Sequence, residues 1–487
     1  MKYKFTVIIP VHNLEKYLEE SIKSILQQNI GFKENIQLIL VNDGSKDKSE
    51  KICKKYEKKY PNNIIYIYQE NKGVSEARNR GISLIKGKYV NFFDGDDKWG
   101  KNAFEKVWDY FEKHYDEIDV VACRQKMFEA RNEYVSLDYK FGKENEIVDI
   151  NIKPDAIHAS VISAFFKSEM VKKHKYDNRL RLGEDSKFLN TIILEKEKYG
   201  LLKDVTHQFR KRKDNSSATQ NMLEKETRYT DTVKYYYQYF YEYSMKKYGE
   251  IIPFVQFLIM NAIKYRVIQH IPKTIEEKIS KKYKEDIIDI VKKTDDDVIL
   301  NIKKTNIYTK IYLLRLKYGN NVLKHIKLKD EYLLFKDKKI GKFPKKNLLF
   351  IDEFNINKNK CFIKGKLRLP VLEENINLYL NSKSESKLIE KDLNRSLSKT
   401  SFNLEHIDNV YEFETQFNLN NNINHINFYL ENNDYKLNLI PIFFNKDLDK
   451  LNKNYKIIDK KLVLVKNSKI IIKNKNIFRL IKHILKK

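Results

Sequence analysis

Cysteine and long apolar runs are both scarce in this chain of 487 residues. The three cysteines, Cys53, Cys123 and Cys361, are far apart and odd in number, so they indicate neither a disulfide framework nor a thiolate metal site, which suits a reducing cytosol. No apolar run reaches the ~18 residues that a membrane span needs. The nearest one, residues 251–263, is interrupted by polar residues and predicts a buried helix. A signal peptide is not expected either, because the first residues lead directly into an apolar strand.

Positive charge is what the chain has in excess. The net charge is +28, from 94 basic and 66 acidic residues. Lysine is spread along the sequence and mixed with asparagine and isoleucine, so much of the excess is compositional bias. It still favours anionic partners such as phosphate-bearing substrates, anionic lipid or nucleic acid. No zinc-ligand spacing, heptad zipper or RNA-binding aromatic motif supports nucleic acid.

Short apolar strands alternate with amphipathic helices up to about residue 215. Such alternation predicts βαβ units and a mainly parallel sheet. Ligands of parallel sheets bind outside the carboxyl ends of the strands, and polar residues fall there: Asn13, Asp43 and the segment 94–97. The expected strands are residues 5–10, 37–41, 64–68 and 89–93, and the expected helices are residues 14–28, 47–60 and 75–85.

The fourth expected strand ends abruptly in three carboxylates, within Phe92-Phe93-Asp94-Gly95-Asp96-Asp97. A buried strand cannot hold such acids unless a positive group lies beside them. Carboxylates one residue apart can share a hard divalent cation, which typically also takes oxygens from substrate phosphates. Asp-Gly-Asp is also a common turn, so this motif by itself leaves both interpretations open.

Several short blocks, in a fixed order, point to one enzyme family. They resemble the inverting nucleotide-sugar glycosyltransferases called family two, of the bacterial cell-surface polysaccharide and teichoic acid type, which have a GT-A fold. Asn42 departs from the pattern, because the family often has a second aspartate there. The blocks are Val7–Asn13, Leu40–Ser45 with Asp47, Asn71–Ser75, Ala77–Gly81, Gly87–Val90 and Phe92–Asp97.

The resemblance implies a donor site and a divalent metal, Mn²⁺ or Mg²⁺. Asp43 would bind the donor's base, Arg78 the base or the diphosphate, and Asp94 the ribose. Asp96, the last residue of the family's DxD motif, would bind the metal. The alternatives are a turn residue for Asp43 and a surface ion pair for Arg78. The donor-binding residues expected in this way are Pro10, Val11, Asn13, Asp43, Arg78, Asn79, Asp94, Gly95 and Asp96.

An acid pair further along the chain resembles the family's catalytic base. Glu184 and Asp185 open an expected helix, where a carboxylate is stabilised as the anion, and Asp185 would accept the proton of the attacking hydroxyl. Helix capping is the alternative. Asp97, Arg210 and Arg212 are expected to contact the acceptor or the diphosphate, although a basic run of this kind is also typical of a solvated loop. His158 and His207 are expected to be packed rather than catalytic.

The remainder of the chain does not look catalytic. A basic helical segment includes an aromatic run, residues 235–241, which favours a core over a sugar-binding platform. Short strands follow from about residue 330 and predict a β-sandwich. The expected fold is an α/β GT-A domain with a Rossmann-like, mostly parallel sheet at residues 1–217. It precedes a helical linker or acceptor region at 218–329, a β-sandwich-like domain at 330–468 and a basic amphipathic tail at 469–487.

The expected function is transfer of a sugar, with inversion and metal assistance, to a hydroxyl of a cell-surface glycan. The sugar is a hexose or N-acetylhexosamine, the resemblance favours a UDP-sugar as donor, and the acceptor is a capsular, teichoic acid-like (polyol-phosphate) or lipid-linked glycan. The alternative is a non-catalytic scaffold that binds carbohydrate or nucleotide-sugar. A processive synthase would need membrane spans and a Gln-x-x-Arg-Trp segment, which neither Trp99 nor Trp108 provides. A nucleotidyltransferase would need a glycine-rich phosphate loop near the first strand.

The location and the partners follow from the same features. We expect a cytoplasmic protein, and the tail favours two alternatives: contact with the anionic inner face of the cell membrane, or docking onto the sandwich or a second copy. A homo-oligomer formed through the C-terminal domain is the corresponding expectation for self-association.

Overall fold

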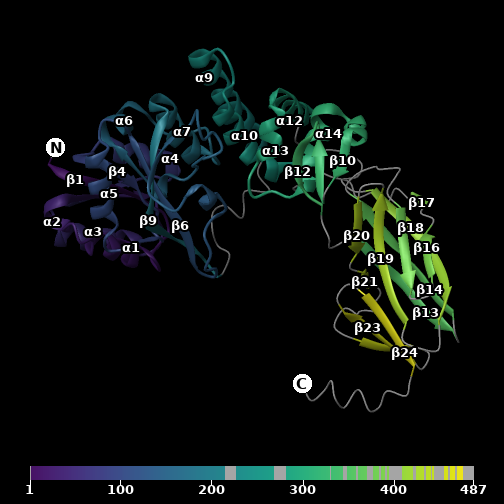
Figure 1. Cartoon of the computed structure of the whole chain (residues 1–487). Coiled ribbons are helices and arrows are strands. Elements are labelled where there is room, and N and C mark those ends of the chain that lie inside the picture. The colour runs from purple at the N-terminus through teal and green to yellow at the C-terminus, as the bar shows by residue number, and fades with distance from the viewer. Residues whose placement is uncertain are drawn as a thin grey trace. The chain divides into compact units, whose positions relative to one another are not determined.

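The structure is a computed structural model (Figure 1). It divides into two compact units: the first holds residues 1–263 with the segments 271–289 and 302–304, and the second holds residues 305–487 with the segments 264–270 and 290–301. The residues described are 2–213, 226–267, 281–329, 331–343, 348–357, 360–369, 377–382, 385–389, 392–393, 409–419, 424–432, 435–439, 441–443, 455–458, 461–466 and 469–474.

A single large sheet forms the centre of the first unit. Strands β3, β2, β1 and β4 pair in parallel, whereas β8 joins β4 and β6 in antiparallel fashion and β6 pairs with β9 in parallel. The strands, in sheet order, are β3 (Ile64–Gln69), β2 (Ile36–Asp43), β1 (Tyr3–Val11), β4 (Gly87–Phe92), β8 (Ala164–Lys167), β6 (Val120–Glu129), β9 (Lys198–Lys211) and β5 (Lys98–Trp99), with β7 (Glu146–Asp149) paired to β9.

The four strands predicted from the sequence match β1 to β4, and the expected GT-A fold class is confirmed. Helices between the strands bury apolar side chains against the sheet, as the contact of Phe5 with Phe104 from the helix Ala103–Lys113 shows, at a ring-centroid distance of 5.0 Å. Because β1, β2 and β4 run in parallel, their carboxyl ends lie at one edge of the sheet. The helices are α1 (Leu18–Leu26), α2 (Phe32–Asn35), α3 (Ser49–Lys59), α4 (Val74–Ile82), α5 (Ala103–Lys113), α6 (Ser168–Lys173) and α7 (Glu184–Lys196).

Half of the aromatic residues in the run 235–241 pack as core, the role that the sequence favoured, and the others are half-buried. Tyr236, Tyr237 and Phe240 are buried, and Tyr236 Oη lies 2.7 Å from the hydroxyl of Ser186 at the start of α7. Residues 233–237 form one π-helical turn between α8 and α9. The helices of this region are α8 (Thr227–Thr232), α9 (Gln238–Tyr248), α10 (Pro253–Arg266), α12 (Lys281–Lys293), α13 (Asp296–Asn301) and α14 (Ile307–Tyr318).

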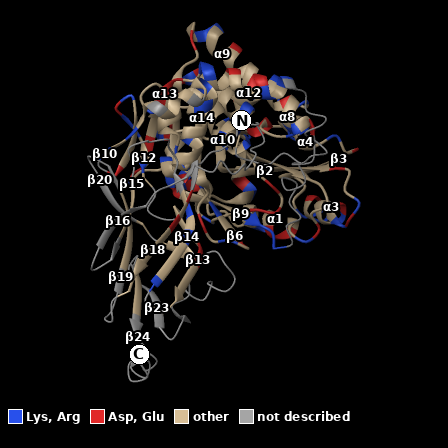
Figure 2. Cartoon of the chain, turned by 90° about the vertical axis from the view of Figure 1, so that its right-hand side faces the viewer, with Lys and Arg blue, Asp and Glu red and all other residues tan. Residues whose placement is uncertain are grey.

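None of the helices in the described ranges has the length and the apolar character to cross a membrane. In Figure 2, basic and acidic residues are spread over many elements of the described chain rather than gathered on one. This distribution agrees with the interpretation that much of the positive charge is compositional.

The C-terminal part is built of strands, as predicted. A three-stranded sheet of β10 (Ile326–Lys329), β11 (Tyr332–Phe335) and β12 (Lys338–Lys342) precedes two larger sheets. Phe413 and Phe428, from the two larger sheets, have ring centroids 6.1 Å apart, so these sheets face each other. Their strands are β17 (Asp392–Leu393), β18 (Asn409–Asn418), β14 (Lys360–Leu369), β13 (Leu349–Asn357) and β21 (Pro441–Phe443) in one, and β16 (Glu385–Ile389), β15 (Asn377–Ser382), β19 (Asn424–Asn432), β20 (Tyr435–Leu439), β24 (Lys469–Asn474), β23 (Lys461–Lys466) and β22 (Tyr455–Ile458) in the other.

The segment predicted as a tail begins as a strand. Residues 469–474 form β24, which pairs with β19 and β23, because Lys469-Ile470-Ile471-Ile472-Lys473 fits an extended, sheet-bound segment rather than a helix. Residues 475–487 lie outside the described residues, so the amphipathic helix and its contact with a membrane stay predictions. The domain boundaries at 217, 329 and 468 stay predictions as well.

Candidate active site

Asp43, at the carboxyl end of β2, organises the loop that precedes α4. Its carboxylate accepts hydrogen bonds from the backbone N–H groups of Lys72 and Gly73, at 2.8 and 2.9 Å, and from Nε2 of Gln69 at 2.8 Å. The side chain is therefore more than a turn residue: it fixes the neighbouring loop at the edge of the sheet where ligands of such folds bind.

Gly73 lets this loop meet a side chain from a distant segment. Its φ of +91° lies in the left-handed region that glycine tolerates. A Cβ atom at this position would lie 2.4 Å from Nη1 of Arg181, so the guanidinium lies against the glycine backbone. Arg181 thereby joins the loop held by Asp43 to the segment that enters α7.

Arg78, on α4, gathers three acids around one buried guanidinium. Nη2 lies 3.2 Å from Oδ1 of Asp94, Nη1 lies 3.8 Å from Glu184, and Nη1 also donates to Oδ1 of Asp185. Only 3% of the Arg78 side chain is exposed, and the Tyr176 ring stacks on it at 5.2 Å. These residues, Asp94, Glu184 and Asp185 around Arg78, are called the Arg78 cluster below.

The Arg78 cluster shifts the pKa values of its acids upward. Burial raises the pKa of Asp185 to about 7, against the lowering influence of the Arg78 guanidinium. Burial likewise raises the pKa of Asp94 to about 6, with Asp96 and Asp185 adding to the rise, and it raises the pKa of Glu184. A carboxyl group with a pKa near 7 can exchange a proton at neutral pH.

Asp96 is held by an arginine from the end of β9. Its Oδ2 accepts hydrogen bonds from Nε and Nη2 of Arg212, at 3.0 and 2.5 Å. Arg210 instead uses its side chain on protein groups, donating to the Asp96 backbone oxygen at 2.7 Å and pairing with Glu20 and Glu129. In this structure the Arg212 side chain contacts the Asp96 carboxylate. Arg210 instead connects the end of β9 to the Asp96 backbone, Glu20 and Glu129.

Asp97 differs from the expectation that it contacts the acceptor or the diphosphate. Its side chain is completely buried, where Oδ1 accepts from the backbone N–H of Arg210 at 2.8 Å and Oδ2 lies 3.4 Å from Nε2 of His207. Burial raises the pKa of Asp97 well above its usual range and lowers the pKa of His207 to about 3. The buried Asp97–His207 pair therefore helps to hold the acid motif against the end of β9. His207 is packed, as predicted.

The acids at the end of β4 suit a hard divalent cation. Asp94 and Asp96 offer carboxylate oxygens, the ligands that Mg²⁺ and Mn²⁺ prefer, and their mutual repulsion contributes to the raised pKa of Asp94, which a bound cation would relieve. Within the described ranges no three His, Cys, Asp or Glu side chains are arranged to hold a metal by themselves. A cation here would need further oxygens from a ligand.

The remaining predicted donor residues line or support the same edge. Pro10 and Val11 end β1, and Asn13 accepts a hydrogen bond from the backbone N–H of Lys46. Gly95 is buried where a Cβ would lie 2.8 Å from Leu14. Asn79 has a structural contact instead. Its Nδ2 donates to the Tyr176 backbone oxygen at 3.0 Å, and its Oδ1 accepts from the Tyr176 backbone N–H at 2.7 Å. It positions the segment that leads to α7.

Arg181 and Tyr176 are the site residues that the sequence analysis missed. Arg181 stands three residues before Glu184, but its contact with Gly73 depends on how that segment folds back. Tyr176 is an isolated aromatic residue without a sequence signal. Neither role could be assigned from local pattern.

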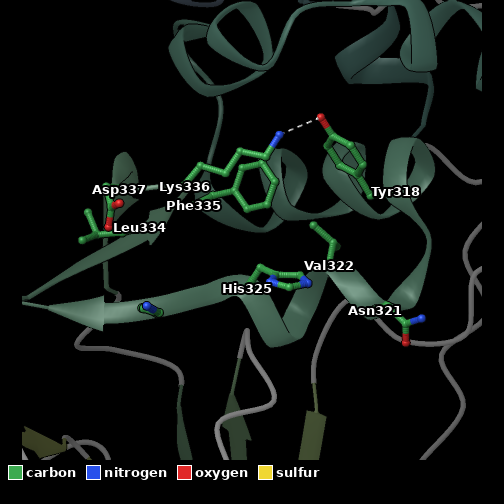
Figure 3. A pocket seen from close by; sticks show the side chains of 9 residues that line it. Tyr318, Asn321, Val322, His325, Leu334, Phe335, Lys336 and Asp337 are labelled. Carbon is green, nitrogen blue, oxygen red and sulfur yellow. Dashed lines mark hydrogen bonds between the residues drawn. The ribbon is translucent and has the colours of Figure 1, made fainter.

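A separate cavity of about 440 Å³ lies in the second unit (Figure 3). Tyr318 and Phe335 form one wall, with ring centroids 5.7 Å apart. Lys336 lies over both rings and donates to Tyr318 Oη at 3.2 Å and to Asp296 at 2.8 Å. None of the predicted site residues lines this cavity, so it is distinct from the acid cluster of the first unit.

Comparisons with known proteins identify the family of the first unit. The sequence profile described as glycosyl transferase family 2 matches residues 6–174. The minor teichoic acid biosynthesis protein GgaB of Bacillus subtilis (strain 168) is 36% identical over 369 residues, which are 74% of this chain and 41% of GgaB. GgaA of the same organism is 31% identical over 330 residues, which are 66% of this chain and 74% of GgaA.

A solved structure has a similar fold over most of the chain. The crystal structure of S. aureus TarS aligns with a TM-score of 0.51 and 14% identity, over 96% of this chain and 85% of TarS. Residues 1–349 of TarS in complex with UDP-GlcNAc align with a TM-score of 0.50 and 17% identity, over 69% of this chain and 97% of that one. The chain thus spans less than half of GgaB but about three quarters of GgaA. The family prediction is confirmed, and the chain belongs to glycosyl transferase family 2.

Proposed function

We propose that this chain transfers a sugar from a UDP-sugar to a hydroxyl of a teichoic acid-type polyol-phosphate polymer, with inversion at the anomeric carbon. The observation that carries the proposal is the Arg78 cluster, in which the acid at the end of β4 and the acid that opens α7 meet at one guanidinium. The names of GgaB and GgaA support a teichoic acid pathway. The UDP-GlcNAc complex of TarS supports a UDP-sugar, with an N-acetylhexosamine as the first sugar to test.

In this proposal Asp185 is the general base. Its side chain is 24% exposed, so an acceptor hydroxyl can reach it, and its position in the first turn of α7 favours the anion. Arg78 holds Oδ1 of Asp185 and so orients the carboxylate toward the hydroxyl. No nucleophilic side chain is needed, because the acceptor oxygen displaces the nucleoside diphosphate directly.

The donor would lie along the edge formed by β1, β2 and β4. Asp43 and the loop that it holds would receive the base, and Arg212 would leave Asp96 to contact the diphosphate. Asp94 would lie near the ribose. Asp96 would hold a divalent cation, Mg²⁺ or Mn²⁺, which when bound neutralises charge that builds up on the departing phosphates.

Nucleotide release by the purified chain tests this proposal. UDP-, GDP- and CDP-sugars are each incubated with Mn²⁺, Mg²⁺ or EDTA. We expect release from a UDP-sugar that stops with EDTA and that falls by about 10²-fold or more in Asp96→Asn, since the transition-state charge is no longer neutralised. Asp116→Asn, an exposed acid of the same unit, is the matched control.

The other outcomes decide against parts of the proposal. Nucleotide release that is unaffected by EDTA would contradict the proposed metal dependence but would still agree with a transferase. Donor binding without release, also in the presence of a polyol-phosphate acceptor, would favour the alternative of a non-catalytic nucleotide-sugar-binding scaffold.

Gly73→Ala tests the loop that Asp43 holds. The new Cβ would collide with Nη1 of Arg181, so we expect UDP to bind about 3- to 10-fold more weakly, as for the loss of one hydrogen-bonded contact. Gly249→Ala is the matched control, since Gly249 also has a positive φ, +77°, but no atom within 4 Å of its Cβ position. Gly249→Ala loses about 1–2 kcal/mol of stability to left-handed backbone strain. Gly73→Ala loses about 1–3 kcal/mol, because φ of +91° with ψ of 165° is essentially restricted to glycine. If calorimetry gave Gly73→Ala and Gly249→Ala the same affinity for UDP, the Gly73 loop would have no role in donor binding.

A further inference from the structure

The cavity of the second unit has the size of a small-ligand site, with a volume of about 440 Å³. It is lined by the end of α14, the 3₁₀ turn Asn320–His325, β10 and the β11–β12 hairpin. In Figure 3 the rings of Tyr318, Phe335 and His325 surround the same space. None of its lining residues is assigned to the donor site above, and it is named the Tyr318 cavity below.

The ring of Tyr318 is fixed although 41% of the residue is exposed. Its hydroxyl lies 2.7 and 2.8 Å from the two carboxylate oxygens of Asp296 and accepts from Nζ of Lys336 at 3.2 Å. Asp296 is held in turn by Nζ of Lys317, at 2.8 Å. Phe335, which is buried, supports the ring from the side. A fixed, partly open aromatic ring can bind an apolar surface with little loss of conformational freedom.

The turn between β11 and β12 places two charged side chains on the wall of the cavity. Phe335 pairs with Lys338, so the turn consists of Lys336 and Asp337, whose φ values are +50° and +62°. Such turns favour glycine and asparagine; aspartate tolerates the conformation, whereas lysine adopts it at a cost. Backbone strain of this kind is typical of functional sites, which favours a role for these side chains in binding.

Several polar side chains of the wall are available to a ligand. Among the residues that the structure describes, four lining side chains have neither a hydrogen bond nor an ion pair: Asn321, His325, Lys327 and Asp337. They comprise one cation, one anion, an amide and an imidazole, so the wall offers both donors and acceptors. Lys336 is already paired with Asp296.

This combination favours a sugar as the ligand. Sugar hydroxyls both donate and accept hydrogen bonds, so they suit a wall that presents Lys327 and Asp337 together. The C–H face of a pyranose ring can pack on the Tyr318 ring. A phosphate group by itself would be repelled by Asp337, and an apolar ligand would leave the polar side chains without partners.

We propose that the Tyr318 cavity binds one sugar residue of a glycan, with the sugar ring stacked on Tyr318. The glycan is the sugar-bearing polymer that the proposed function would produce, and this identification alone rests on the proposed function. Sugar binding itself depends only on the side chains of the cavity wall.

Titration of the full chain with methyl glycosides, followed by saturation-transfer difference NMR, tests the proposal. The glycosides are those of glucose, galactose, N-acetylglucosamine and N-acetylgalactosamine, and glycerol 3-phosphate represents a polyol phosphate without sugar. Saturating UDP and Mg²⁺ fill the donor site. The variants are Tyr318→Ala, Tyr318→Phe and Asp337→Asn. Tyr265→Ala, an exposed tyrosine of the same unit that does not line the cavity, is the matched control.

We expect at least one glycoside to bind the wild-type chain and Tyr265→Ala equally. Tyr318→Ala should bind it about 3- to 10-fold more weakly, the range of one aromatic contact, whereas Tyr318→Phe keeps the ring and should stay within about 3-fold. Asp337→Asn distinguishes a sugar from a phosphate. Loss of the charged acceptor should weaken the glycoside by about 3-fold or more, but loss of the repulsion should strengthen glycerol 3-phosphate. Thermal melting shows whether each variant is folded.

Three results would overturn the proposal. If the wild-type chain bound none of the glycosides, the cavity would not be a sugar site. Equal glycoside affinities of the wild-type chain and folded Tyr318→Ala would assign the ring a structural role. If glycerol 3-phosphate bound more tightly than every glycoside, and more tightly still to Asp337→Asn, the cavity would be an anion site. Nucleotide release, measured in parallel, tests the proposed function separately, because sugar binding without release would remove only the link to a polymer product.

Discussion

Replacing Asp185 by asparagine is expected to lower kcat for sugar transfer by about 10²- to 10⁴-fold, the usual contribution of a general base. Asparagine keeps the shape of the side chain and can still accept a hydrogen bond from Arg78, but it cannot take the proton of the acceptor hydroxyl. UDP binding, measured by calorimetry, should stay within a few-fold of the wild-type value. Glu195→Gln, an exposed acid on the same helix, is the matched control for kcat.

The pH profile provides the second measurement for Asp185. Since burial raises its pKa to about 7, the protonated form predominates below that pH and cannot act as a base. We expect kcat/KM of the wild-type chain to fall on the acidic side with a midpoint near pH 7, and this limb to be absent from the residual activity of Asp185→Asn. An unchanged kcat in the variant, or the same acidic limb, would exclude Asp185 as the base.

Replacing Arg78 by methionine is expected to destabilise the first unit by about 3–5 kcal/mol, the cost of removing one partner from a buried ion-paired cluster. Arg78 is 3% exposed and contacts Asp94, Glu184 and Asp185, so methionine would fill much of the space but remove the guanidinium that these three acids share. Calorimetric melting of the first unit measures the loss. Arg80→Met, an exposed arginine on the same helix, should melt as the wild-type chain does.

The loss in Arg78→Met should shrink as the pH falls. Folded-state pKa values of about 6 for Asp94 and about 7 for Asp185 lie above those of the unfolded chain, so the native state binds the extra protons and these acids reduce stability mainly above pH 7. Below about pH 5 they are protonated and no longer need the guanidinium. A destabilisation that is independent of pH would indicate that Arg78 stabilises the fold by packing alone.

Local sequence was sufficient for the elements and for the acid motifs. The strands β1 to β4 follow from short apolar runs with polar ends, and the acids at 94–97 and 184–185 stand at a strand end and a helix start that periodicity places correctly. The predicted basic amphipathic tail, residues 469–487, begins differently, because pairing with β19 and β23 makes Lys469–Asn474 a strand.

Long-range packing alone decided which of these residues meet. Arg78 reaches Asp185 across 107 positions, and Arg212 reaches Asp96 across 116. Asp97 is buried against His207, whereas the sequence analysis expected it to contact the acceptor or the diphosphate. Periodicity reports how each segment lies relative to its own neighbours, whereas charge pairing and burial depend on which distant segments the folded sheet brings together.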